Sequence, residues 1–232
     1  MEDQQQKKAL ITGTSNGIGL ALAKKLLDEG YKVIGLSGNL SSISNTNYQH
    51  KLIDLSKNSH INSVYLDLVK QNVSLDFFYI NNSFTSGLNS IDNINEDALE
   101  KSINFNFKSV FWFLKYFCNI TKPNEGKIIV NISAESITGN PEKVLFCAAQ
   151  SALFSIVQSF SKYLKEEKIK VIALYTGIIN NDDLFVKSFV SGDEAKRTDT
   201  EENLVSEIFD IITNDEIPSG SRVFINHKTI EN

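Results

Sequence analysis

A cluster of three glycines between an apolar run and a helical run constrains the fold of this chain most. Gly13, Gly17 and Gly19 follow the β-rich residues 8–12 and open a helical pattern over residues 17–29. Glycine adopts backbone angles that other residues disfavour, and it lets main-chain N–H groups approach an anion. The N-terminus of a helix adds partial positive charge at the same place. The strand–turn–helix pattern therefore predicts a site for a phosphate or pyrophosphate group.

The rest of the chain alternates β-rich runs with helical runs, which predicts a parallel sheet covered by helices on both faces. The continuously apolar run at residues 75–80 is typical of a strand buried on both sides. We expect strands at residues 8–12, 32–36, 51–53, 75–80, 127–132, 170–174 and 222–226, and helices at 17–29, 61–71, 93–120, 144–167 and 203–213. Asn93, three residues before Glu96, is expected to cap the third of these helices. The expected fold is a single α/β domain over residues 8–232, with a doubly wound parallel sheet of the Rossmann type and a flexible tail at residues 1–7.

Composition argues against several other kinds of protein. A chain of 232 residues can bury one good core, and a formal charge of -5 argues against a surface for nucleic acid. Cys118, Cys147 and three scattered histidines form neither a disulfide framework nor a metal-binding pattern. Residues 1–8 are polar, unlike a signal peptide, and polar residues interrupt the apolar run at 105–120. We therefore expect a cytoplasmic protein that binds neither nucleic acid nor membrane.

Four motifs lie in order along nearly the whole chain. Thr12 precedes the spacing Gly-x-x-x-Gly-x-Gly, and Ile53-Asp54-Leu55 follows the expected third strand. Asn81-Asn82-Ser83-Phe84 follows the fourth strand, and Asn131-Ile132-Ser133, followed by Gly139-Asn140, ends the fifth. Together these motifs resemble the short-chain dehydrogenase/reductase family, whose members bind NAD or NADP on a Rossmann-type fold.

The resemblance implies that NAD or NADP is the cofactor, with pyrophosphate at the glycine turn and adenine near Asp54. The implied cofactor-binding residues are Gly13, Ser15, Asn16, Gly17, Ile18, Gly19, Ser37, Asp54, Leu55 and Asn82. NAD-preferring members commonly end the second strand with an acidic residue, whereas NADP-preferring members place Arg or Lys there or in the glycine turn. Ser37-Gly38 and Asn16 carry neither charge, so the preference stays open. Asp54 has the alternative role of an ordinary residue at a strand end or helix cap.

The catalytic residues of the family are only partly matched. Members use a Tyr-x-x-x-Lys pair, in which Tyr gives a proton to the substrate oxygen, and Lys holds the nicotinamide ribose and lowers the Tyr pKa. Counted from Ser133, these positions fall on Phe146 and Gln150, which offer neither a hydroxyl nor a positive charge. Ser133 and Asn106 match the serine and asparagine that complete the catalytic tetrad of the family. Both residue types also commonly form hydrogen bonds to nearby backbone groups, which is the alternative role of these two residues. Loss of a general acid costs about 10²–10⁴ in rate, so carbonyl reduction is expected to be slow or absent.

Other departures from the family pattern lie on the nicotinamide side of the expected site. Phe84 replaces a glycine beside the cofactor ribose, and Thr176-Gly177 replaces the usual Pro-Gly. Asn181 stands where a threonine commonly touches the cofactor, and residues 182–202 are shorter than the usual substrate lid. Residues 226–228 lack the terminal Asp-Gly-Gly. The adenine half of the pattern is therefore retained, whereas the nicotinamide half is eroded.

Three functions fit these residues. The first is a protein that binds a dinucleotide without the standard redox machinery, as a non-catalytic subunit, a scaffold or a cofactor-responsive partner. The second is an active oxidoreductase for a small-molecule substrate with an unusual proton donor, such as water held by Ser133 and Asn106. Cys147 does not replace the Tyr, because it lies one position further along the helix and its side chain therefore points about 100° away from that of the Tyr position. It is expected to be a buried core residue. The third is a non-redox enzyme, which no Ser-His-Asp or paired-carboxylate arrangement supports.

Two helical runs bear on assembly. Residues 105–120 and 148–163 are apolar on more than one side, as in helices that pack on a sheet and on a partner. Related proteins commonly pair through these helices, so the resemblance implies a homo-oligomer, either a dimer or a tetramer, or pairing with an active homologue. The alternative is one broad apolar face within the core of a monomer.

Overall fold

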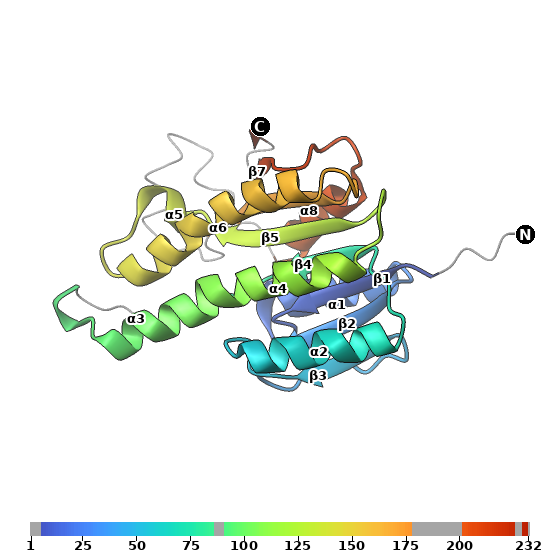
Figure 1. Cartoon of the computed structure of the whole chain (residues 1–232), viewed down its shortest axis with the longest axis horizontal. Coiled ribbons are helices and arrows are strands. Elements are labelled where there is room, and N and C mark those ends of the chain that lie inside the picture. Colours follow the sequence, from blue (N-terminus) through green and yellow to red (C-terminus); the bar gives the residue numbers. More distant parts are fainter. Residues whose placement is uncertain (1–5, 86–90, 178–200, 226–228, 232) are drawn as a thin grey trace, which may run out of the picture.

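An eight-stranded sheet forms the centre of the fold (Figure 1). The computed structural model describes residues 6–85, 91–177, 201–225 and 229–231. The strands are β1 (Lys8–Thr12), β2 (Lys32–Ser37), β3 (Tyr48–Leu52), β4 (Phe77–Ile80), β5 (Lys127–Ser133), β6 (Lys170–Thr176), β7 (Arg222–Phe224) and β8 (Thr229–Glu231). Their order is β3-β2-β1-β4-β5-β6-β7-β8; all neighbours are parallel except β8, which is antiparallel to β7. This confirms the doubly wound parallel sheet, with the strand order reversing between β1 and β4, where such folds bind ligands.

Helices cover both faces of this sheet (Figure 1). They are α1 (Gly17–Asp28), α2 (Asn58–Lys70), α3 (Glu96–Ile103), α4 (Ser109–Phe117), α5 (Glu135–Thr138), α6 (Val144–Tyr163) and α8 (Glu201–Thr213). On one face α1 packs against α8, and on the other α4 lies between α2 and α6. In Figure 1, α3 and α5 lie at the left end of the molecule, where α6 begins.

Strand β4 shows how the sheet is buried from both sides. Phe78 and Ile80 pack in the layer that contains α2, α4 and α6, whereas Phe77 and Tyr79 pack in the layer that contains α1 and α8. All four side chains are buried. A central parallel strand therefore needs apolar residues on both faces, which is the pattern that the sequence shows.

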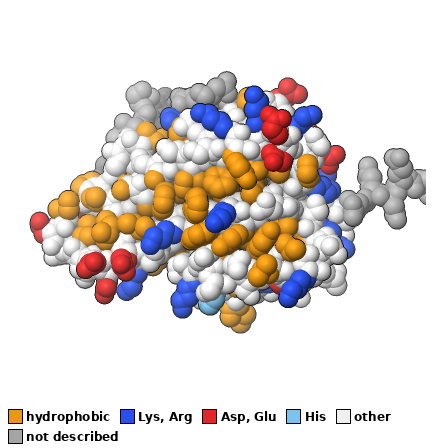
Figure 2. All heavy atoms as spheres, in the orientation of Figure 1, with side chains coloured by type: hydrophobic (Ala, Val, Ile, Leu, Met, Phe, Trp, Pro, Cys, Tyr) orange, Lys and Arg blue, Asp and Glu red, His pale blue; other side chains and the backbone are white. Residues whose placement is uncertain are grey.

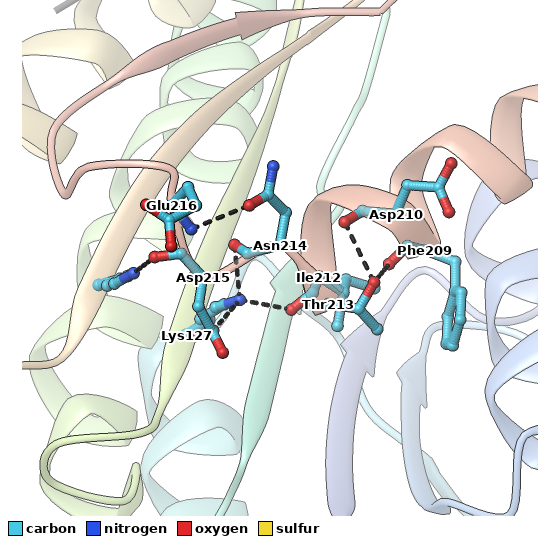
Figure 3. Close-up of polar contacts among 9 residues, drawn as sticks. Lys127, Phe209, Asp210, Ile212, Thr213, Asn214, Asp215 and Glu216 are labelled. Atoms are coloured by element: carbon cyan, nitrogen blue, oxygen red, sulfur yellow. Dashed lines mark hydrogen bonds and ion pairs between the residues drawn. The ribbon is translucent and has the colours of Figure 1, made fainter.

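Lys127 at the start of β5 ties the sheet to the end of α8 (Figure 3). Its ammonium donates hydrogen bonds to the carbonyls of Ile212 (2.7 Å) and Asn214 (2.9 Å) and pairs with Asp215 at 2.8 Å. The Lys127 side chain is 6% exposed and that of Asp215 is 84% exposed. The last carbonyls of a helix lack partners within the helix, so a buried ammonium there satisfies them and complements the helix dipole.

All expected strands are present, and so are the expected helices apart from the one at residues 93–120, but several boundaries differ. β3 covers residues 48–52 and not 51–53, because this edge strand contains three successive polar residues, 49–51, and has no apolar run. β4 begins at Phe77 and not at residue 75, where Leu75 forms only a single bridge to Thr121. α6 ends at residue 163 and not at 167, because the backbone leaves helical geometry at Leu164 (φ -93, ψ 16). The sequence does not predict β8, and the tail expected at residues 1–7 lies largely outside the described residues.

The helix expected at residues 93–120 is a series of shorter segments. They are η1 (Ile91–Asn93), α3, the π-helical segment η2 (Asn104–Lys108), α4 and η3 (Cys118–Ile120). The cap prediction is wrong by two residues: the Asn95 side chain, not that of Asn93, accepts a hydrogen bond from Ala98 N at 2.9 Å. Asn93 belongs to η1, and the extended backbone of Asn95 is what a capping residue needs.

Among the described residues, α6 alone has the length and hydropathy to cross a membrane. The core helix of a soluble protein has the same properties, and α6 buries Leu153 and Val157 in the layer that it shares with α4. The packing against the sheet therefore accounts for one side of its apolar composition.

Candidate functional site

The glycine turn joins β1 to α1 at the edge of the sheet where the strand order reverses. Gly13 (φ 76) and Gly17 (φ 53) have backbone angles that other residues rarely adopt. A Cβ on Gly19 would lie 2.3 Å from the Gly13 carbonyl oxygen, so the turn folds back on itself too tightly for a side chain. Asn16 caps α1 without a side-chain hydrogen bond to it. The first N–H groups of α1 are therefore left to an anion.

A cavity of about 610 Å³ opens beside this turn. It is lined by Gly13, Ser15, Asn16, Ser37, Gly38, Asn39, Leu52, Ile53, Asp54, Leu55, His60, Asn81, Ser83 and Phe105. Six of the expected cofactor residues are among them, whereas Gly17, Ile18, Gly19 and Asn82 are not. Asn82 is buried and donates a hydrogen bond to Ser109 Oγ at 2.9 Å. The sequence does not point to His60 or Phe105, because the folded chain brings them here from α2 and η2.

Asp54 is the only carboxylate on the described wall of this cavity. It accepts hydrogen bonds from the Ser56 hydroxyl (2.6 Å) and the Ser56 N–H (3.0 Å) and lies 3.5 Å from Lys57 Nζ. The Ser56 hydroxyl above all, with the Ser56 N–H and Lys57, holds the pKa of this carboxyl below its usual range. Asp54 thus shapes the turn before α2, and its side chain, 40% exposed, keeps a negative charge at the cavity.

A hydrogen-bonded chain ties β3 to the glycine turn. The Tyr48 hydroxyl lies 2.9 Å from Thr14 Oγ1 and 3.0 Å from His50 Nδ1. The other ring nitrogen of His50 lies 3.1 Å from the Asn39 carbonyl oxygen. Tyr48 passes over Gly35 of β2, where a Cβ would lie 2.2 Å from its hydroxyl. The sequence reasoning missed these residues because it placed β3 too late, at residues 51–53.

Asn106, the expected tetrad asparagine, is fully buried in η2 and braces the chain after β4. Its Oδ1 accepts a hydrogen bond from Phe84 N at 2.8 Å, and its Nδ2 donates to Phe84 O at 2.8 Å and to Ser102 Oγ at 3.2 Å. The Phe84 ring packs on Phe105, with ring centroids 5.6 Å apart. Asn106 therefore fixes the backbone of Phe84, the residue expected to stand in place of a glycine of the family pattern.

Gln150 and Ser133 are brought together by β5 and α6. The Gln150 Oε1 accepts a hydrogen bond from the Ser133 N–H at 3.0 Å. The Gln150 side chain is buried, and its Nε2 has no hydrogen-bond partner within the described part of the chain. Phe146 begins the same turn of α6 and is also buried. The two substituted tetrad positions thus present a ring and an internally bonded amide.

The strand ends around the site are joined by side chains. Thr176 Oγ1 donates to Asn131 Oδ1 at 3.0 Å, and Asn131 Nδ2 donates to Asn81 Oδ1 at 2.9 Å. The Asn81 N–H donates to Thr12 Oγ1 at 2.8 Å. These bonds hold the ends of β1, β4, β5 and β6 in register beneath the site. Thr176, expected to stand in place of a proline of the family pattern, therefore has a hydrogen-bonding role.

Cys147 is buried, as the sequence predicts, and borders a second cavity of about 450 Å³ next to α5. Burial, helped by the nearby Glu135 carboxylate, raises the pKa of this thiol, which opposes formation of a reactive thiolate. No group of three His, Cys, Asp or Glu side chains in the described part of the chain forms a metal site.

Comparison with known proteins decides the family. The sequence model described as short chain dehydrogenase matches residues 7–188. The chain belongs to the short-chain dehydrogenase family. It is 29% identical over 190 residues to sorbitol-6-phosphate 2-dehydrogenase of Klebsiella pneumoniae, covering 75% of this chain and 70% of that protein. It is 31% identical over 189 residues to the 3-oxoacyl-(acyl-carrier-protein) reductase FabG of Rickettsia felis, covering 78% of this chain and 76% of the reductase.

Solved structures of short-chain dehydrogenases share the fold. A short-chain dehydrogenase of Leptospira borgpetersenii with bound NAD+ superposes with a TM-score of 0.83 at 17% identity, covering 97% of this chain and 92% of that one. A family member of Francisella tularensis gives a TM-score of 0.76 at 23% identity, covering 95% and 97%. At such identities the likeness establishes the architecture only.

Several expected features of this short-chain dehydrogenase lie outside the described residues. Asn181, most of the segment at residues 182–202 and residues 226–228 are among them. The roles assigned to the tetrad positions and to the cofactor-binding residues therefore remain predictions, which the geometry of the described residues now makes specific.

Proposed function

We propose that this member of the short-chain dehydrogenase family binds a nicotinamide dinucleotide without performing the standard hydride transfer of the family. The observation that carries the proposal is the 3.0 Å hydrogen bond from Ser133 N to Gln150 Oε1. A lysine ammonium is a donor only and cannot accept this bond. Gln150 therefore joins α6 to β5 through a hydrogen bond that a lysine at this position could not form.

The proton-donor position supports the same proposal. Phe146 is 7% exposed and carries no ionisable group. Asn106 is engaged at both ends of its amide by Phe84 and Ser102, so its side chain is committed to structure. Loss of a positioned general acid costs about 10²–10⁴ in rate, and the missing lysine charge adds to the loss without simple additivity.

The cofactor that the family implies fits one half of the site. Gly19 leaves the space that a Cβ would fill, α1 offers its first N–H groups, and Asp54 lies on the cavity wall. These residues would hold the adenosine and pyrophosphate. A bound nicotinamide would exchange a hydride at its ring, but Phe146 and Gln150 do not supply the groups that the family uses beside it.

Calorimetric titration with NADH and NADPH, together with nicotinamide absorbance in the presence of aldehydes and ketones, tests the proposal. We expect binding of at least one cofactor and no turnover. Robust turnover by the wild-type protein that Ser133→Ala abolishes would refute the proposal and favour an active oxidoreductase with another proton donor. Turnover without cofactor would refute it in favour of a non-redox enzyme. The turnover of a Phe146→Tyr, Gln150→Lys double variant, whose folding is checked by circular dichroism, is the matched comparison.

We also propose that the chain pairs through α4 and α6, with a second copy or with an active homologue. Figure 2 shows hydrophobic side chains gathered in a band on this face. Phe111 on α4 is 37% exposed, and its ring contacts that of Phe160 on α6 with centroids 6.3 Å apart. Light scattering should show an oligomer that Phe111→Glu dissociates, whereas Val69→Glu on α2 should not. A monomeric wild-type protein at micromolar concentration would refute homo-oligomerisation.

The cytoplasmic location remains a prediction from the sequence.

A further inference from the structure

The walls of the 610 Å³ cavity come from one side of the site. All described lining residues lie between residues 13 and 105, on the glycine turn, the ends of β2 and β4, the β3–α2 connection, His60 of α2, and η2. Ser133, Phe146 and Gln150 are not on this wall. The volume is within the range of roughly 300–1,000 Å³ that is usual for a single small-molecule ligand.

Polar groups on this wall remain available to a ligand. The first N–H groups of α1 have no side-chain cap, and the Asn16 side chain is exposed. The Asp54 carboxylate is ionised, oriented by Ser56, and 40% exposed. A pyrophosphate suits the helix N-terminus, and a base with an amino group suits an oriented carboxylate.

On the other side of the site, the side chains of Asn106 and Gln150 form hydrogen bonds within the protein. Asn106 is fully buried with both ends of its amide bonded. The Gln150 Oε1 is bonded to Ser133 N, and the Gln150 Nε2, which has no partner among the described residues, is buried with the rest of this residue, of which only 1% is exposed. A ribose or nicotinamide that used these groups would have to break these bonds, and the positions expected to hold the family's Tyr and Lys, Phe146 and Gln150, supply no positive charge. Contacts on that side therefore offer little net binding free energy.

We propose that the affinity of this site resides in the adenosine diphosphate half of its ligand, so that an adenosine diphosphate sugar without nicotinamide binds as tightly as NADH. The inference rests on the proposed function, because it concerns the same site. Its consequence is that the redox state of the nicotinamide does not change the affinity. The protein then responds to the total concentration of adenosine diphosphate ligands.

Calorimetry on the full chain with ADP-ribose, NADH, NAD+ and nicotinamide mononucleotide tests this inference. The dissociation constants of the first three should agree within about fivefold, and the mononucleotide should not bind at millimolar concentration. NADH binding more than fivefold tighter than ADP-ribose, or measurable mononucleotide binding, would overturn the inference and leave the proposed function standing. If none of the four ligands binds, both the inference and the proposed function are refuted.

Two aspartate variants show where the ligands bind. Asp54→Asn removes the carboxylate on the cavity wall and should weaken ADP-ribose and NADH by the same factor, about tenfold. Asp67→Asn on α2 is the matched control, since Asp67 pairs with Lys51 away from the cavity wall, and both affinities should stay unchanged. Unchanged affinities in Asp54→Asn would place the ligands elsewhere and overturn the inference.

Discussion

Gly35 in β2 lies where a side chain would collide with the support of the glycine turn. Its Cβ would lie 2.2 Å from the Tyr48 hydroxyl oxygen and 2.5 Å from Thr14 Oγ1. Gly35→Ala must therefore displace Tyr48 and break its 2.9 Å hydrogen bond to Thr14. Overpacking costs about 1–3 kcal/mol and a lost neutral hydrogen bond about 1 kcal/mol, so we expect the free energy of unfolding to fall by about 3 kcal/mol.

A double-mutant cycle measured by urea unfolding tests this reasoning. In a Tyr48→Ala background the larger obstacle is absent and only the Thr14 contact remains, so Gly35→Ala should cost about 1 kcal/mol there. The difference between the two backgrounds, about 2 kcal/mol, is the coupling between Gly35 and Tyr48. Gly38→Ala is the control, because its Cβ would meet nothing closer than 3.8 Å, and it should change stability by less than about 0.5 kcal/mol. An equal cost of Gly35→Ala in both backgrounds would refute the collision.

Three further outcomes are expected. NADPH should bind at least about tenfold more weakly than NADH in calorimetry. The described cavity wall carries the Asp54 carboxylate and no Lys or Arg that could pair with a 2′-phosphate. Equal affinities for the two cofactors would contradict this prediction. Lys127→Met should lower the free energy of urea unfolding by about 2 kcal/mol, since it leaves the carbonyls of Ile212 and Asn214 without their charged donor. Lys170→Met removes a more exposed hydrogen bond to Asp215 O and should lower it by less than about 1 kcal/mol. Equal losses in the two variants would refute the role of burial. Because the folded-state pKa of the Asp54 carboxyl is lowered, its contribution to stability is present above the unfolded-state pKa and is lost as the pH falls through the folded-state pKa. The stability difference between wild type and Asp54→Asn should therefore be largest near neutral pH and shrink on acidification, and a difference independent of pH would contradict this.

The central sheet can be predicted because its strands are apolar on both faces. The run at residues 127–132 and the four buried residues of β4 are visible without any knowledge of their neighbours. The position of the edge strand β3 is predicted wrongly because the strand is partly exposed and its central three residues are all polar. The helix expected at residues 93–120 is divided into shorter segments, and its sequence holds no Pro or Gly that would mark the π-helical turn at residues 104–108.

The candidate site is predictable where it depends on local sequence and not where it depends on packing. Gly13 and Gly19 are required by the turn itself, and Asp54 follows directly from its strand. His60 and Phe105 reach the cavity only through the packing of α2 and η2 on the sheet. The acceptor role of Gln150 toward Ser133 likewise exists only after β5 and α6 meet.

The π-helical turn η2 has a consequence for how this chain can change during evolution. A π-turn fits one residue more into the helix than an α-helical turn does, and here it lies between α3 and α4 with Asn106 at its centre. Deletion of one residue within 104–108 would restore a regular α-helical turn between α3 and α4 and would change the directions in which the remaining side chains of this turn point. Asn106 and Phe105 could not then both keep their partners, the Phe84 backbone and the Phe84 ring. Substitutions keep the length of this segment, whereas a change of its length would displace Phe105, the residue of the segment that lines the 610 Å³ cavity.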